Sequence, residues 1–251
     1  MEVSFKDIQE ARNHLRSIVY KTSLVHNTTF SEMTGNLIYF KTENLQKTGS
    51  FKVRGAFNKI ASLPDFQKKC GVIASSAGNQ AQGVAMAATA YGIKSTIVMP
   101  KHAPLSKIAA TKSYGAEVVL YGEVYDEAYE KAKEIQEQSG ATFVHPFDDE
   151  EIIAGQGTIG IEILEDLPDA DVIVVPVGGG GLISGISIAA KHIKPDIKII
   201  GVQTQNLPSM AKAIAQNRIS TVEGPATIAD GIAVKTPGEL TFRIVQQYVD
   251  D

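Results

Sequence analysis

A lysine between two apolar residues is the first group in the sequence that could act as a nucleophile. Lys52 lies between Phe51 and Val53, in the segment Ser50–Gly55. Partial burial of such an amine would lower its pKa and free its lone pair for attack on a carbonyl carbon. A lysine alone is nearly always a solvated surface group, so its assignment depends on the other motifs of the chain.

A run of four glycines could bind an anion. Gly178, Gly179, Gly180 and Gly181 follow the apolar run 172–177 and precede Leu182. Without Cβ atoms, backbone N–H groups can converge on an anion at the positive end of the next helix, and phosphate is the natural guest. The alternative is a tight, flexible turn, which four glycines at a strand-to-helix junction make less attractive.

The glycine run does not match the dinucleotide or nucleoside-triphosphate motifs. Ile183 occupies the position of the third glycine in G-x-G-x-x-G, and 201–204 contains no acidic residue to bind a ribose. No G-x-x-x-x-G-K-[ST] motif occurs. A nucleotide-binding regulator is therefore the weakest of the functional hypotheses.

A second polar turn, 75–80, follows another apolar run and precedes a predicted helix. Its hydroxyls, amides and free N–H groups suit a carboxylate ligand. An ordinary helix N-cap is an equally good interpretation of this turn by itself. The candidate ligand-binding residues are Ser75, Ser76, Gly78, Asn79 and Gln80.

Short β-branched runs alternate with longer amphipathic segments, which predicts an α/β fold with parallel sheets covered on both faces. Because ligands of such sheets lie at the carboxyl ends of strands, the two polar turns are expected to face one cleft. The expected strands are 37–41, 71–74, 95–99, 116–121, 142–144, 172–177 and 197–202. The expected helices are 51–62, 79–91, 105–114, 125–138, 152–165, 182–192 and 208–216.

Composition excludes several other classes. The net charge of −4 gives no electrostatic reason to expect a nucleic acid or an anionic membrane. No signal peptide or apolar run of about 20 residues is apparent. The single cysteine, Cys70, excludes an intrachain disulfide framework and favours a reducing, cytoplasmic location. The five histidines lack metal-ligand spacing, and a structural, hydrogen-bonded role is the better interpretation of His145 at the end of a strand.

The segment 43–56, with Lys52 in Ser-Phe-Lys-Val-Arg-Gly, resembles the cofactor-lysine motif of fold-type II pyridoxal-phosphate enzymes. Within that group it is most similar to the threonine and serine dehydratases, and it resembles a catabolic-type member that is short at the C-terminus. The segment 75–83 resembles their substrate-carboxylate loop and 178–182 their phosphate loop, while 154–158 and 227–235 are further similar segments. The resemblance covers nearly the whole chain, with the motifs in the family's order.

The resemblance implies an architecture of two open, twisted parallel-sheet domains, similar to the tryptophan synthase β subunit, with the active site between them. The large domain would consist of 1–41 plus 144–251, and the small inserted domain of 42–143. Family catalytic regions continue past the position of Asp251 to a segment that bonds the pyridine nitrogen. The large domain is therefore expected to be incomplete, which leaves a catalytically impaired binding fragment as an alternative. A homodimer or homotetramer is expected from the family.

The resemblance also implies roles for individual residues. Lys52 would hold pyridoxal 5'-phosphate as a Schiff base and then remove the substrate α-proton. Phe51 would pack beside the cofactor, and Asn79 would bond its ring hydroxyl. The carboxylate site would consist of Ser75, Ser76, Gly78, Asn79 and Gln80. The phosphate site would consist of Gly178, Gly179, Gly180, Gly181 and Leu182.

The expected reaction is dehydration and deamination of L-threonine to 2-oxobutanoate and ammonia, and of L-serine to pyruvate, in isoleucine biosynthesis or threonine catabolism. Serine racemases of this family place a serine opposite the lysine, where this chain has Ala77. Alanine cannot transfer a proton, so the position favours elimination over the alternative, racemisation. The segment 203–209 lacks the two carboxylates of the racemase metal site, and no metal is expected there.

Overall fold

The computed structural model describes residues 3–251 and contains a four-stranded parallel sheet in the order β5-β4-β3-β6. Residues 72–75 of β3 pair in register with 95–98 of β4. Alternate residues of β3 face opposite sides, since Val72 and Ala74 join one hydrophobic core and Ile73 joins another. The strands are β3 (Val72–Ser75), β4 (Ser95–Met99), β5 (Glu117–Leu120) and β6 (Thr142–Phe143).

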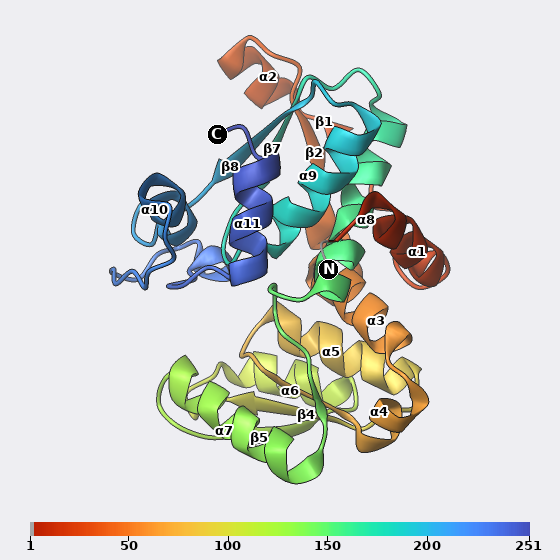
Figure 1. Cartoon of the computed structure of the whole chain (residues 1–251), viewed down its shortest axis with the longest axis vertical. Coiled ribbons are helices and arrows are strands. Elements are labelled where there is room, and N and C mark those ends of the chain that lie inside the picture. The colour runs from red at the N-terminus through yellow and green to blue at the C-terminus, as the bar shows by residue number, and fades with distance from the viewer. Residues whose placement is uncertain (1–2) are drawn as a thin grey trace.

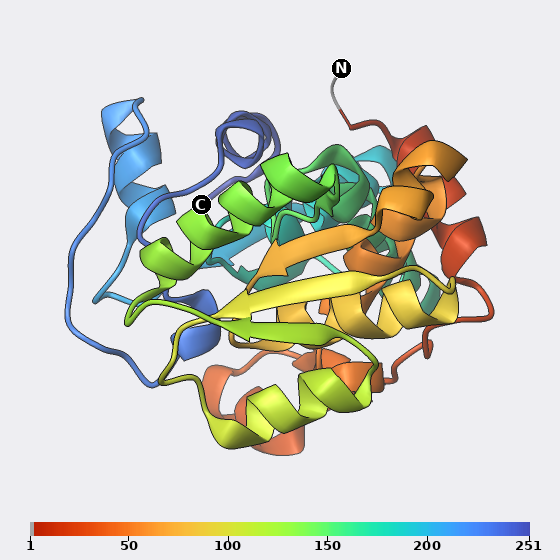
Figure 2. The same cartoon turned by 90° about the horizontal axis from the view of Figure 1, so that it is seen from below.

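Helices cover both faces of this sheet, as Figure 2 shows from below. The core with Val72 and Ala74 contains residues of α3 and α5, whereas the core with Ile73 contains Ala128 and Ala132 of α7. The sequence prediction of a parallel sheet buried on both faces is thus confirmed here. The helices of this part are α3 (Lys52–Ser62), α4 (Asp65–Cys70), α5 (Asn79–Ala90), α6 (Leu105–Ser113) and α7 (Tyr125–Ser139).

The remaining elements lie at the other end of the molecule in Figure 1, around the parallel pair β7–β8. Here the prediction of a sheet buried on both faces was wrong. Val172 and Val174 of β7 are 43% and 60% exposed, and only the alternate residues of the strand are buried. The elements are β7 (Val172–Pro176), β8 (Lys198–Val202), α8 (Glu150–Asp166), α9 (Gly181–Ile193), α10 (Ser209–Gln216) and α11 (Glu239–Tyr248).

Several elements were not predicted. Helix α1 (Phe5–Leu15) is capped by Ser4, whose hydroxyl accepts from the Asp7 N–H, a capping pattern visible in the sequence. Strand β1 (Leu24–His26) and α2 (Thr28–Thr34) were missed, whereas β2 (Tyr39–Lys41), the antiparallel partner of β1, lies within the predicted strand 37–41. Helices α4 and α11 were also missed. Short 3₁₀ turns are η1 (Glu43–Leu45), η2 (Lys47–Gly49) and η3 (Asp230–Ile232). Across residues 3–251, none of the helices is long and apolar enough to cross a bilayer.

Helix α3 contacts both α5 and α8 between the two sheet regions (Figure 1). Glycines bring their backbones close together. A Cβ on Gly155 of α8 would lie 2.6 Å from the Cα of Gly55 in α3. A Cβ on Gly83 of α5 would lie 3.3 Å from the backbone of Lys52. The first turn of α3 is therefore held between two other helices.

Candidate active site

Lys52 is the first residue of α3, and its amine points at the segment that follows β6. The Nζ atom donates a hydrogen bond to the carbonyl oxygen of Pro146 at 2.5 Å and lies 5.5 Å from the centroid of the Phe51 ring. Burial lowers the pKa of Lys52 from 10.5 to about 8, because the charged amine loses its hydration. A lysine with this pKa has a far larger neutral, nucleophilic fraction near pH 8 than a solvated lysine.

The turn 75–80 leads from β3 into α5 and lacks the side-chain cap that would satisfy its helix. Gly78 is the N-cap of α5 and offers no side-chain acceptor, and a Cβ there would meet nothing within 4 Å. The Ser76 hydroxyl accepts from the Gly78 N–H at 3.1 Å. Within residues 3–251, the buried Ser75 Oγ and Gln80 Oε1 have no hydrogen-bond partner. An ordinary N-cap therefore does not account for the turn, which has room and free polar groups for a ligand.

The four-glycine turn leads from β7 into α9. Gly180 has φ +100°, a conformation that side chains with a Cβ rarely adopt, and it is the N-cap of the helix. A Cβ on Gly179 or Gly181 would overlap Phe147. The Thr241 hydroxyl of α11 donates to the Gly179 carbonyl oxygen at 2.7 Å. The turn is thus packed on one side, and the first N–H groups of α9 have no acceptor within the helix.

Three consecutive residues, 145–147, connect these separate parts of the sequence. The His145 carbonyl oxygen accepts from Gln80 Nε2 at 3.4 Å, and the Pro146 carbonyl oxygen accepts from Lys52. Phe147 packs against the glycine turn. The lysine, the polar turn and the glycine turn are therefore brought together at one place. From the residues alone only the two turns were expected to face one cleft, and the resemblance had added Lys52 to the same site.

His145 determines the shape of this connecting segment. Its Nδ1 atom accepts hydrogen bonds from the N–H groups of Phe147 and Asp148, at 3.3 and 2.8 Å. Because both donors are backbone amides, Nδ1 is unprotonated and the ring proton lies on Nε2. Burial lowers the pKa of His145, which favours this neutral form. The structural role expected for His145 agrees with these bonds, and its carbonyl oxygen also borders the site.

Sequence reasoning missed the contribution of the residues after His145. Pro146 and Phe147 received no role, although they contact the lysine and the glycine turn. The Asp148 carboxylate accepts from the N–H groups of Glu239 and Thr241 and so caps α11, the helix that holds Gly179. The only signal in the sequence was a polar and aromatic cluster after a strand, which does not reveal what it contacts.

The sequence and the fold were compared with those of known proteins to identify the family of this chain. A family model described as "Pyridoxal-phosphate dependent enzyme" matches residues 15–251. The chain belongs to the family of pyridoxal-phosphate dependent enzymes. An L-threonine ammonia-lyase of Thermotoga maritima is 59% identical over 249 residues, covering 99% of this chain and 62% of the relative. A catabolic L-threonine dehydratase of Escherichia coli is 50% identical over 251 residues, covering 100% of this chain and 76% of the relative.

Solved structures of the family agree. The processed form of threonine deaminase isoform 2 from Solanum lycopersicum has a TM-score of 0.94 at 37% identity, covering 100% of this chain and 75% of that one. Maize serine racemase has a TM-score of 0.96 at 38% identity, covering 100% and 76%. The predicted family and its α/β fold type II are confirmed. The chain spans 62% of the length of its Thermotoga relative.

Family membership also confirms the predicted cofactor, pyridoxal 5'-phosphate, and the residues present fit its parts. A buried amine of lowered pKa suits an aldehyde, and the first N–H groups of α9, which have no acceptor within the helix, suit a phosphate. The unpaired Ser75 Oγ and Gln80 Oε1 add polar groups beside them. The assignment of individual residues to cofactor and substrate stays a prediction.

Proposed function

We propose that this chain carries the catalytic site of an L-threonine ammonia-lyase that also accepts L-serine. The observation that supports it best is the connecting segment 145–147, which contacts Lys52, Gln80 and the glycine turn at once. Relatives with 50 to 59% identity bear threonine ammonia-lyase or dehydratase names, in agreement with the proposal. The products would be 2-oxobutanoate and ammonia from threonine, and pyruvate and ammonia from serine.

In this proposal each predicted segment has one task. The backbone of 178–182 binds the cofactor phosphate, Phe51 packs beside the ring, and Asn79 bonds its hydroxyl. The turn 75–80 holds the substrate carboxylate at the N-terminus of α5, where the helix dipole favours negative charge. The bound cofactor supplies an electron sink for the charge left at the α-carbon. Lys52 would hold the cofactor covalently and, once the substrate amine has displaced it, its free amine would move the α-proton, aided by the lowered pKa.

The residue opposite the lysine favours elimination. Ala77 lies in the turn before α5 and packs against the hydrophobic core. Its methyl group can neither donate nor accept a proton, so proton transfer is restricted to the Lys52 face. Serine racemisation, for which both faces need a proton donor, is the alternative that the fold permits, since maize serine racemase shares it.

The test is a spectrum and a product assay on the purified chain. Addition of pyridoxal phosphate is expected to give a visible absorption band that Lys52→Ala abolishes, and threonine is expected to yield 2-oxobutanoate. Lys112→Ala, which removes an exposed lysine of α6, is the matched control and keeps both signals. A band without oxo acid would support the catalytically impaired alternative, and formation of D-serine from added L-serine would support racemisation. The absence of any Lys52-dependent band would refute the proposed site.

The remaining predictions form part of the same proposal. The division into 1–41 plus 144–251 and 42–143 places the polar turn and Lys52 in the smaller part and the glycine turn in the larger part. A cytoplasmic homodimer or homotetramer is proposed from the family resemblance and the single cysteine. Light scattering of the purified chain measures the oligomeric state directly.

A further inference from the structure

Two residues after Lys52, an arginine is completely buried. Arg54 has 0% exposure, and it is the largest of the fully buried side chains in the described part of the chain. Its Nε and Nη2 atoms donate to the two carboxylate oxygens of Glu43, at 2.9 and 2.8 Å. Its Nη1 and Nη2 atoms donate to those of Glu162, at 2.6 and 2.9 Å. One guanidinium group thus forms bidentate hydrogen bonds with two carboxylates.

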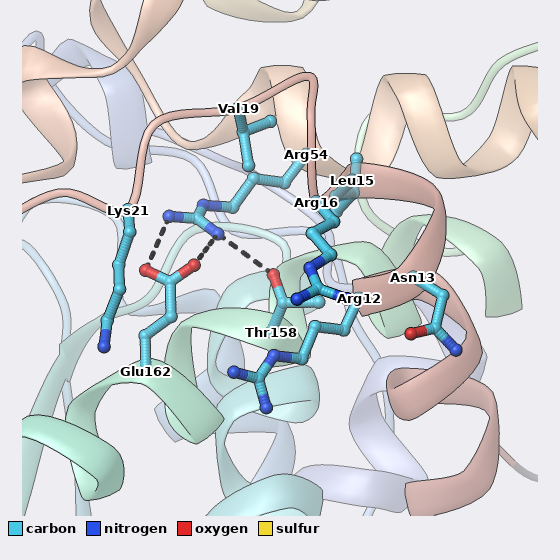
Figure 3. A pocket seen from close by; sticks show the side chains of 9 residues that line it. All are labelled: Arg12, Asn13, Leu15, Arg16, Val19, Lys21, Arg54, Thr158 and Glu162. Atoms are coloured by element: carbon cyan, nitrogen blue, oxygen red, sulfur yellow. Dashed lines mark hydrogen bonds and ion pairs between the residues drawn. The ribbon is translucent and has the colours of Figure 1, made fainter.

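Further partners complete the cluster, part of which Figure 3 shows. Arg54 Nη1 donates to the Thr158 hydroxyl at 3.2 Å, and Nη2 donates to the Tyr20 carbonyl oxygen at 3.2 Å. Lys41 forms an ion pair with Glu162 at 2.7 Å with 7% of its side chain exposed. Two cations and two carboxylates therefore balance in charge, as burial requires. The cluster ties α3 to α8, to η1 and to the end of β2.

The guanidinium is saturated by protein acceptors, since all three of its nitrogens donate. It also borders a cavity of about 410 Å³ whose lining includes Arg12, Arg16 and Lys21 but not Lys52. Arg54 therefore has no free donor for cofactor or substrate, and its effect on the reaction must pass through the backbone of α3. That backbone is already in close contact with α5 at Gly83 and with α8 at Gly155.

From this arrangement we infer that Arg54 is a positioning residue for the cofactor lysine. Bidentate bonds fix the direction of a guanidinium as well as its distance, which a single ammonium cannot do. The first turn of α3 is thereby held in one orientation relative to α8 and η1. Lys52, at the start of that turn, keeps its amine at the Pro146 carbonyl oxygen and on the same side as Gln80 and the glycine turn. The inference rests on the proposed function of Lys52.

The experiment compares Arg54→Lys, which keeps the charge and loses the bidentate bonds, with wild type. The control is Arg12→Lys, because Arg12 borders the same cavity but its side chain is 46% exposed and pairs with Glu165 at 2.6 Å. The first readout is the rate at which pyridoxal phosphate becomes attached to Lys52, trapped with borohydride and located by peptide mass. The second is kcat and KM for threonine, measured on variants whose circular dichroism matches wild type.

Arg54→Lys is expected to slow attachment at Lys52 and to lower kcat by about 100-fold, the scale of a misplacement near 1 Å, with a much smaller change in KM. Arg12→Lys is expected to match wild type. Attachment and kcat at wild-type levels in folded Arg54→Lys would overturn the inference. If that variant does not fold, Thr158→Val decides in its place, because it removes the bond from Arg54 Nη1 together with the bond that the Thr158 hydroxyl donates to the Gly155 carbonyl oxygen. A several-fold loss in attachment rate and kcat supports the inference, and wild-type values overturn it.

Failure of the proposed function gives a different result. Wild-type protein that attaches the cofactor at Lys52 but does not consume threonine refutes the ammonia-lyase proposal, and the attachment rates still test Arg54. Wild-type protein that attaches no cofactor at Lys52 overturns both.

Discussion

Replacing Lys52 by methionine is expected to stabilise the cofactor-free protein at neutral pH, although it abolishes the chemistry. The pKa of Lys52 falls from 10.5 to about 8 through burial. At about 1.4 kcal/mol per pKa unit, burying the protonated amine costs up to about 3 kcal/mol. This is an upper bound, because the residue as a whole keeps some exposure. Methionine fills similar space without a charge but leaves the Pro146 carbonyl oxygen without its donor, a loss of about 1 kcal/mol.

The pH dependence follows from the sign of the shift. Below pH 8 the amine is protonated in both the folded and the unfolded chain, and the full cost of burial applies. Between pH 8 and 10.5 the unfolded chain binds more protons, so the stability of wild type rises with pH. Lys52→Met is therefore expected to be more stable than wild type by about 1–2 kcal/mol at pH 7, and the advantage is expected to vanish by pH 10.

Urea denaturation of the cofactor-free proteins at pH 7 and pH 10, followed by circular dichroism, measures this difference. Lys112→Met serves as the control, since it removes an exposed lysine and is expected to change little at either pH. A Lys52→Met protein that is less stable than wild type at pH 7, by the same amount as at pH 10, would show that Lys52 is not a buried amine of lowered pKa.

Three further substitutions test other parts of the site. Gly179→Ala places a Cβ against Phe147 and is expected to weaken pyridoxal phosphate binding at least about tenfold in an absorbance titration; unchanged affinity would contradict the packing. His145→Phe removes the acceptor of two backbone N–H groups and is expected to lower the free energy of unfolding by about 1–3 kcal/mol. Because the pKa of His145 is lowered, wild type is expected to lose stability as pH falls below 6.5, and a variant with the same pH slope would refute this. Glu162→Gln breaks two buried ion pairs and is expected to lower the free energy of unfolding, measured by urea denaturation, by about 3–5 kcal/mol. The control Glu165→Gln, at an exposed ion pair, is expected to lower it by less than about 1 kcal/mol. Equal losses would contradict the buried network.

Much of the fold could be predicted because its signals are local. The run 95–99 is apolar and β-branched, and it forms β4 with the expected bounds. The helix after the polar turn begins at Asn79, where a small-residue turn ends. By contrast, α11 was missed although Gly238 precedes it, because its acceptor for two N–H groups is Asp148, far away in the sequence. The exposed face of β7 was also not predicted, because the short apolar run 172–177 does not show which neighbours cover each of its faces.

In the candidate site, too, some features follow from the local sequence and others only from the tertiary structure. The sequence by itself determined which residue types could do the chemistry: a lysine among apolar neighbours, a polar turn and a glycine turn, each at the junction of a strand or coil with a helix. Only the tertiary structure decided that 145–147 contacts all three, that burial lowers the pKa of Lys52, and that Arg54 is saturated by Glu43 and Glu162. Backbone conformation depends on neighbouring residues, whereas burial and hydrogen bonding of side chains depend on segments that approach only after the chain has folded.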